Sequence, residues 1–196
     1  MAGQPRNERR RSRRPPAPLD AARLEEMALA YVARFATSAG RLAAYCRRKL
    51  RERGHAGADE GTAPPDIDAL VARFVASGFV DDAGYARAKA GGLLRRGYGS
   101  RRVGEALRAD GIGEQLRADV APGEHARREA VVVYARRRRF GPFARAPSDD
   151  PRAADKQLAA MLRAGHGHGD ARHVLRALTA EALAAWVDEA CEDTAR

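Results

Sequence analysis

The chain has 196 residues, of which 44% are hydrophobic, 32% are charged and only 6% are aromatic, and its formal net charge is +10. This length suits one domain or two small ones, and the low aromatic content favours a helical protein over an aromatic-rich sheet protein. No stretch approaches the roughly 18 consecutive apolar residues of a membrane span. The two cysteines, Cys46 and Cys191, lie far apart in the sequence, so we expect no disulfide framework and a reducing, cytoplasmic setting.

The positive charge predicts an acidic partner, either nucleic acid or an acidic protein surface. Half of it lies in residues 1–18, which hold six arginines, one glutamate and four prolines. Such a segment cannot bury a core, and we expect it to be disordered. A flexible arm that engages phosphates and a merely solvated tail are both open interpretations. Arginine far outnumbers lysine, a bias that a GC-rich coding sequence would also produce.

Three helices are expected in the first third of the chain, because apolar residues recur there at helical spacing. The first begins near Asp20, and the second covers residues 41–53 and ends at Gly54. Residues 55–65 are a loop rich in Gly, Pro and acidic residues, and a third helix follows from Asp66 to Ser77-Gly78. The first helix carries these residues on its apolar face: Leu24, Met27, Ala28, Tyr31 and Phe35.

The stretch Gly78–Ile112, GFVDDAGYARAKAGGLLRRGYGSRRVGEALRADGI, organises the rest of the chain. One aspartate of the pair Asp81-Asp82 is expected to N-cap a helix that stops at Arg95-Arg96-Gly97. Ser100 then caps a second helix, which Gly111 closes, and a short third helix follows.

The last third of the chain repeats this arrangement. A first helix ends in the run Arg136–Arg139, and a second ends before Gly165. Asp170 is expected to cap the next helix, with Leu178 among its inward residues. A last helix runs from about Thr179 to Glu192.

The second helix of each unit ends in a related signature, KLRERG, ALRADG or MLRAG, and the final glycines Gly54, Gly111 and Gly165 are 57 and 54 positions apart. Short helical units that cannot bury a core alone do so by stacking. We therefore predict an all-α, elongated and curved array of tandem three-helix repeats. The predicted repeats are residues 19–80, 81–122 and 123–178, with an extra C-terminal helix in 179–196.

Two arginine clusters fall at the end of the first helix in successive repeats. Cations there stabilise a helix C-terminus by a few tenths of a kcal/mol, roughly 0.3 or more, which would be a purely structural role. The functional hypothesis is that they line one face of the array and contact a polyanion or an acidic groove. The candidate contact residues are Arg87, Arg95, Arg96, Arg101, Arg102, Arg136, Arg137, Arg138 and Arg139. The residues expected to shape turns are Gly78, Asp81, Asp82, Tyr85, Gly97, Gly99 and Gly111.

No catalytic motif is present, since the sequence lacks a serine-nucleophile elbow, a P-loop and a dinucleotide-binding glycine fingerprint. We therefore expect no catalytic residues, no cofactor and no metal. His166, His168 and His173 lack a Cys or carboxylate partner at a typical ligand spacing, and a metal enzyme built on them is the third alternative. Residues 100–120 resemble a helix-turn-helix, which any helical repeat produces, so a nucleic-acid-binding regulator is the second alternative.

Taken together, these motifs resemble the RecX (OraA) family, bacterial regulators of the RecA recombinase. The resemblance covers roughly residues 24–178 and is carried by KLRERG at 49–54, GFVDDAGYAR at 78–87 and RRGYGSRRVGEALRADGI at 95–112. The sequence departs from the family pattern in lacking a proline at Tyr98-Gly99-Ser100 and in the GHGHGD turn of the third unit. The Arg-rich tail and the helix with Trp186 look like additions.

The resemblance implies a cytoplasmic, non-catalytic protein of tandem three-helix repeats. Such proteins bind along the groove of the RecA filament on single-stranded DNA. They dampen strand exchange, ATP hydrolysis and repressor cleavage in homologous recombination, DNA repair and the SOS response. The expected partners are thus the RecA filament and single-stranded DNA, contacted directly or through the filament. We expect a monomer and no membrane association.

Overall fold

The computed structural model describes residues 17–145 and 151–192, so most of the predicted basic arm lies outside the described residues. Within these ranges the chain forms ten α-helices, two short 3-10 turns and no β-strand, which confirms the all-α prediction. The helices are α1 (Ala21–Val32), α2 (Ala39–Arg53), α3 (Ile67–Ala76), α4 (Asp82–Arg95), α5 (Ser100–Ala109), α6 (Glu114–Asp119), α7 (Glu124–Arg138), α8 (Pro151–Arg163), α9 (His168–Arg176) and α10 (Ala180–Glu192), and the 3-10 turns are Ala58–Glu60 and Gly141–Phe143.

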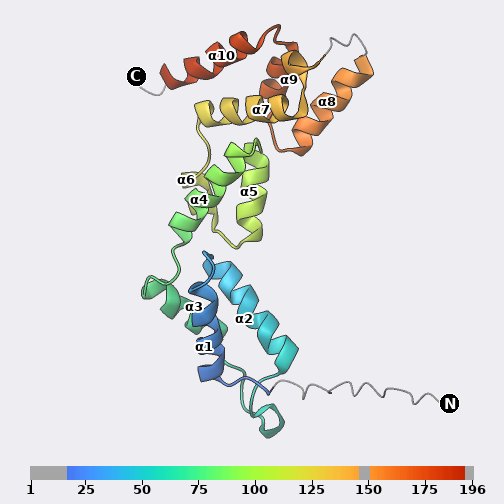
Figure 1. Ribbon diagram of the computed structural model, residues 1–196. Helices are drawn as coiled ribbons and strands as arrows, with labels where there is room; N and C mark the ends of the chain where they lie inside the picture. Colours follow the sequence, from blue (N-terminus) through green and yellow to red (C-terminus); the bar gives the residue numbers. More distant parts are fainter. Residues whose placement is uncertain (1–16, 146–150, 193–196) are drawn as a thin grey trace, which may run out of the picture.

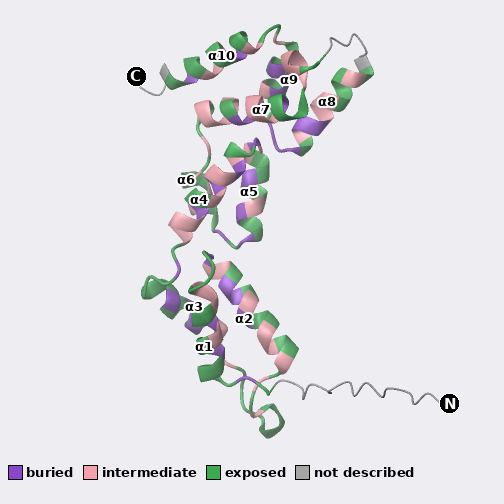
Figure 2. Ribbon diagram, viewed as in Figure 1, coloured by how far each residue is buried: buried purple, intermediate pink, exposed green. Residues whose placement is uncertain are grey.

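The helices follow one another along an elongated molecule (Figure 1), with α1–α3 at one end, α4–α6 in the middle and α7–α10 at the other end. Each group has its own hydrophobic core, and Figure 2 shows buried residues in all three groups. Representative core residues are Leu24, Leu42 and Phe74 in the first group, Leu93, Val103 and Leu107 in the second, and Val131, Met161 and Val174 in the third.

Helix α10 belongs to the third group, because Leu183 is fully buried in the third core and α10 packs against α7. Trp186 packs against the same core from the outside. The last helix is therefore part of a packed unit, although the limits assigned to the repeats from the sequence stay a prediction.

Two residues expected inside the protein are exposed. Phe35 is 53% exposed because α1 already ends at Val32, and its ring packs against Tyr31 at 5.4 Å between ring centroids. Leu178 is 91% exposed because α9 ends at Arg176 and the chain turns there toward α10.

Two expected N-caps are also displaced. Helix α5 is capped by Gly99 and α9 by Gly167, so Ser100 lies inside the first turn of α5 and Asp170 inside that of α9. Position 99 admits only glycine, because a side chain there would collide with the backbone of Gly165.

Successive groups are joined head to tail through their second helices. The hydroxyl of Ser38, which caps α2, donates to the carbonyl oxygen of Asp110 at the end of α5, at 2.5 Å. At the next junction Gly99 N donates to Ala164 O at 2.9 Å, and Arg101 N donates to Gly165 O at 3.2 Å. The carbonyls left free at one helix end thus accept from the start of the next helix, through the capping hydroxyl of Ser38 at the first junction and through backbone amides at the second.

Glycine is required where these helices meet. A Cβ atom on Gly40, in the first turn of α2, would lie 2.7 Å from both Gly111 Cα and Asp110 O. Gly111 itself has φ +79°, which only glycine adopts without cost. The first and second groups can therefore approach closely enough for the Ser38–Asp110 hydrogen bond because Gly40 and Gly111 carry no side chain where they meet.

A second set of contacts at the first junction surrounds the buried carboxylate of Asp110. It accepts hydrogen bonds from Tyr85 OH at 2.8 Å, from Arg41 Nη1 at 3.2 Å and from Lys89 Nζ. Burial alone would raise the pKa of Asp110, but the hydrogen bonds from Lys89 and Tyr85 outweigh burial and hold the pKa below its usual range. Asp82 adds a further tie, since it accepts from Ala39 N at 2.8 Å.

Replacement of Gly40 by Ala should destabilise the protein by about 1–3 kcal/mol, because the new methyl group would force the first junction apart. Gly104→Ala is the matched control, since Gly104 also lies in a helix but has nothing within 4 Å of its Cβ position. The control should stabilise by about 0.5–1 kcal/mol through helix propensity. Urea unfolding followed by circular dichroism measures both, and a Gly40→Ala protein as stable as the control would contradict the close approach.

Replacement of Asp110 by Asn should cost about 2 kcal/mol of unfolding free energy at pH 7, because three donors lose a charged acceptor. The folded pKa is depressed, so the stabilisation by the carboxylate is complete above about pH 5 and is lost as the pH falls below the unfolded value of about 3.9. The difference between the two proteins should therefore shrink in acid.

The matched control is Asp68→Asn, because Asp68 forms an exposed ion pair with Arg47 at 2.8 Å. It should change stability by less than about 0.5 kcal/mol. If Asp110→Asn lowers the free energy of unfolding by the same amount at pH 3 and pH 7, the stabilisation does not depend on the charge of Asp110.

Candidate anion-binding site

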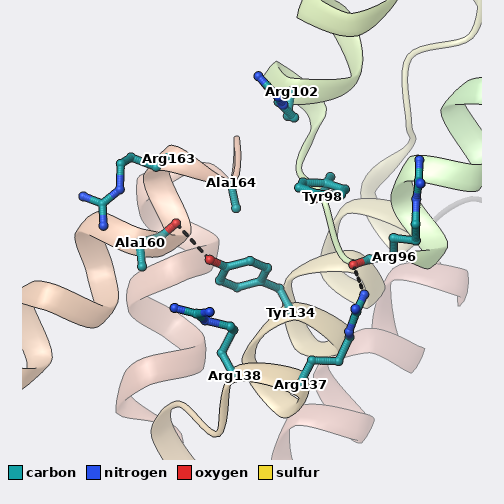
Figure 3. A pocket seen from close by; sticks show the side chains of 9 residues that line it. All are labelled: Arg96, Tyr98, Arg102, Tyr134, Arg137, Arg138, Ala160, Arg163 and Ala164. Atoms are coloured by element: carbon teal, nitrogen blue, oxygen red, sulfur yellow. Dashed lines mark hydrogen bonds between the residues drawn. The ribbon is translucent and has the colours of Figure 1, made fainter. Parts of the chain in front are cut away.

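Five arginines meet in an open depression of about 730 Å³ at the second junction, where α4, α5, α7 and α8 come together (Figure 3). Two tyrosines lie among them, and no carboxylate lines the depression. The lining residues are Arg96, Tyr98, Arg102, Tyr134, Arg137, Arg138, Ala160, Arg163 and Ala164.

The same local turn presents the arginines of α4 and of α7. Helix α4 is followed by Gly97 with φ +82°, and Tyr98 N donates back to Leu93 O at 3.1 Å. After α7, Arg139 takes the left-handed conformation with φ 58°, and the next amide donates to Ala135 O at 2.9 Å. These endings are typical of helices that stop at a left-handed residue. They bring the last-turn arginines of consecutive repeats to the same junction.

The floor of the depression carries no charged side chain and is held in place by hydrogen bonds. The Tyr134 hydroxyl donates to Ala160 O at 3.2 Å, which ties α7 to α8. His166, 7% exposed, donates from Nε2 to Gly97 O at 3.0 Å, and its ring lies 5.3 Å from that of Tyr134. Burial lowers the pKa of His166 although the Gly97 carbonyl favours the charged form, so the imidazole is neutral at pH 7.

The arginines are poorly compensated by acidic groups. Arg102 lies 3.6 Å from Glu105 in an exposed pair, and Arg137 donates to the Arg96 carbonyl at 2.7 Å. In residues 17–145 and 151–192, no carboxylate oxygen comes within 4.0 Å of the guanidinium groups of Arg96, Arg137, Arg138 or Arg163. Guanidinium groups stay charged and bind carboxylate or phosphate oxygens in pairs. The depression is therefore suited to a ligand with several anionic oxygens.

Four of the nine arginines predicted as contacts line this depression, and five do not. Arg87 and Arg95 are exposed on α4 outside it. Arg101 donates to Leu162 O at 2.6 Å and so takes part in the junction itself. Arg136 lies over the ring of Phe143 at 5.2 Å, and Arg139 forms the left-handed turn after α7.

Sequence reasoning missed Arg163 and Tyr134. A signal for Arg163 was present in the MLRAG signature. The matching signature ALRADG ends α5, which contacts the preceding repeat, so the end of α8 with Arg163 is expected at a junction as well. No comparable signal exists for Tyr134. Its place depends on the contact with Gly97, where a Cβ atom would lie 2.8 Å from Tyr134 N.

The residues expected to shape turns lie at turns or junctions. Gly78 has φ +73°, and Asp81 caps α4 by accepting from Gly84 N at 2.9 Å. Asp82 instead reaches across the first junction to Ala39, and Tyr85 donates to the Asp110 carboxylate at that junction. Gly99 has an ordinary extended backbone conformation, so glycine is needed there only because the end of α8 lies so close.

The three histidines do not converge. His166 is buried beside Tyr134, His168 is exposed at the start of α9, and His173 stacks on Trp186 at 4.2 Å. Among the residues that the structure describes, no group of three His, Cys, Asp or Glu side chains is placed to hold a metal ion. No described helix combines the length and apolar character needed to cross a membrane.

The helix-turn-helix alternative has little support. Helix α6, which would follow the turn, has six residues and carries Glu114 and Asp119. Carboxylates on so short a helix oppose the approach of phosphates.

Comparison with known proteins finds no matching family model. A curated relative, the regulatory protein RecX of Myxococcus xanthus (strain DK1622), is 31% identical over 177 residues, which cover 88% of this chain and 95% of the relative. The crystal structure of a regulatory protein RecX aligns with a TM-score of 0.54 at 16% identity, over 79% of this chain and 72% of that chain, and supports the fold. With such identity along nearly the whole of both chains, the protein belongs to the RecX family of regulatory proteins.

Proposed function

We propose that this RecX-family protein regulates the RecA recombinase by binding in the groove of its filament on single-stranded DNA. Bound there, it dampens strand exchange, ATP hydrolysis and repressor cleavage. The observation that carries the proposal is the convergence of five arginines, without a lining carboxylate, at the second junction of an elongated array. The protein acts by binding and has no catalytic role.

The elongated fold suits a filament better than a small ligand. Three cores in a row give the molecule a long surface, along which it can contact neighbouring recombinase subunits. An open depression of arginines on that surface fits the acidic groups of a filament groove or the phosphates of the DNA inside it.

The junction also presents the arginines at fixed spacing. Arg96 and Arg102 belong to the second group, whereas Arg137, Arg138 and Arg163 belong to the third. Backbone hydrogen bonds between Gly99 and Ala164 and between Arg101 and Gly165 hold the two groups together. A ligand therefore meets a partly preorganised set of charges, which lowers the ordering cost of binding.

Neutralising the depression should weaken regulation. Arg96→Gln combined with Arg163→Gln removes one charge from each side of the junction, at two exposed positions. About tenfold more of this variant than of the wild type should be needed to inhibit ATP hydrolysis by the cognate recombinase on single-stranded DNA, because two charge-assisted contacts are lost. The wild-type protein should inhibit at substoichiometric amounts.

The matched control is Arg51→Gln with Arg108→Gln, which makes the same change of net charge at exposed arginines outside the depression. It should inhibit like the wild type. Equal inhibition by both double variants would refute the role of the depression. Wild-type inhibition seen only at DNA-saturating amounts, and abolished by excess DNA or modest salt, would mean simple competition for phosphates and would favour a recombinase-independent nucleic-acid binder.

A further inference from the structure

A second hollow, of about 710 Å³, lies between α9 and α10 on the third group. It has no part in the junction, and it gathers residues that the sequence singled out without a function, namely two of the three histidines and the single tryptophan. Its lining residues are His168, Gly169, Arg172, His173, Arg176, Ala177, Ala182, Trp186 and Glu189.

An aromatic stack forms one wall of the hollow. The ring of His173 lies on the indole of Trp186, with centroids 4.2 Å apart and planes inclined by 22°. The guanidinium of Arg128 lies over the same indole at 4.7 Å. Trp186 is thus in contact with both Arg128 and His173.

The inner end of this stack is fixed. Arg128 is 14% exposed, and it donates to Glu124 and to the Trp186 carbonyl, each at 2.5 Å. Its Nη1 also lies 3.7 Å from Glu189. His173 at the other end of the stack is exposed, so its ring offers an aromatic surface to solvent.

Two arginines and a histidine lie beside this surface on one face of α9. His168, Arg172 and Arg176 are spaced by four residues, so they share that face, and all three are exposed. Within the described ranges, no carboxylate lies within 4.0 Å of Arg172 or Arg176. Glu189, the one acidic residue of the lining, faces Arg128, which offsets its charge.

We propose that this hollow binds a nucleotide unit, with its base stacked on the outer face of His173 and its phosphate held by Arg172 and Arg176. A flat aromatic plate next to guanidinium groups matches the two halves of a nucleotide, whereas an acidic peptide would use only the arginines. The nucleotide can be free or part of a single strand, because both offer a base and a phosphate. The binding needs no recombinase, so this inference stands independently of the function proposed above.

Trp186 is the only tryptophan in the chain, so its fluorescence reports on this hollow alone. The full-length protein is titrated, without recombinase, with ADP, with a short single-stranded DNA and with an abasic sugar-phosphate oligomer of the same length. Saturable quenching by ADP at an affinity similar to that of the DNA assigns the site to free nucleotides. Much tighter quenching by the DNA assigns it to nucleotides within a strand.

His173→Ala should weaken binding about tenfold, because the stacking surface is lost. The exposed position of His173 leaves the third core intact, which circular dichroism verifies. Because this change alters the indole environment, its affinity is also read by anisotropy of a labelled ligand. Arg172→Gln with Arg176→Gln should weaken binding and flatten its salt dependence, whereas Arg51→Gln with Arg108→Gln should do neither.

Three results would overturn the proposal: no quenching by either nucleotide ligand, equal affinity for the abasic oligomer, or unchanged binding by His173→Ala. Nucleotide binding that persists while the protein leaves the recombinase unaffected would refute the proposed function and keep this inference. If the protein still regulates the recombinase but no nucleotide ligand quenches Trp186, this inference is refuted and the proposed function is kept.

Discussion

The meeting of one helix start with the next helix end is the contact on which the array depends. An α-helix leaves donors free at its start and carbonyls free at its end. Here the ends of α5 and α8 supply acceptors to the starts of α2 and α5. These contacts need backbones nearly in touch, so glycines stand at both junctions. Each group of three or four helices has too small a core for a large stability of its own, and stacking through these helices joins the groups into one molecule.

The two junctions share this geometry but differ in charge. Asp110 and Ala164 occupy the same place, one residue before Gly111 and Gly165. At the first junction the Asp110 carboxylate is buried and draws in Lys89 and Arg41. At the second junction Ala164 offers no charge, and it lines a depression whose arginines stay available to a ligand. The two junctions thus differ by one carboxylate. At the first junction Asp110 binds the neighbouring cations, whereas at the second the arginines stay available to an anionic partner.

Much of this architecture could be predicted from the sequence, because it depends on local signals. Apolar spacing, capping aspartates and glycines after the last turn indicate helices and their ends. Arginines in the last turns of successive first helices pointed to Arg96, Arg137 and Arg138. These local patterns gave wrong predictions where contacts between segments far apart in the sequence determine the structure. Ser100 was favoured as a cap by residue type, but the cap is Gly99, which lies against the backbone of Gly165.

Helix α7 connects the two arginine-lined surfaces of the third group. Arg128 supports the aromatic stack beneath α10, while Arg137 and Arg138 reach the depression at the second junction. Nine residues separate Arg128 from Arg137, which corresponds to about 14 Å along a helix axis. The helix thereby sets the spacing between a surface that favours flat aromatic groups and one that favours several anionic oxygens. A compact acidic cluster on a protein can satisfy only the second. A ligand that engages both must be extended and must carry bases as well as phosphates, and those are the properties of a single nucleic-acid strand.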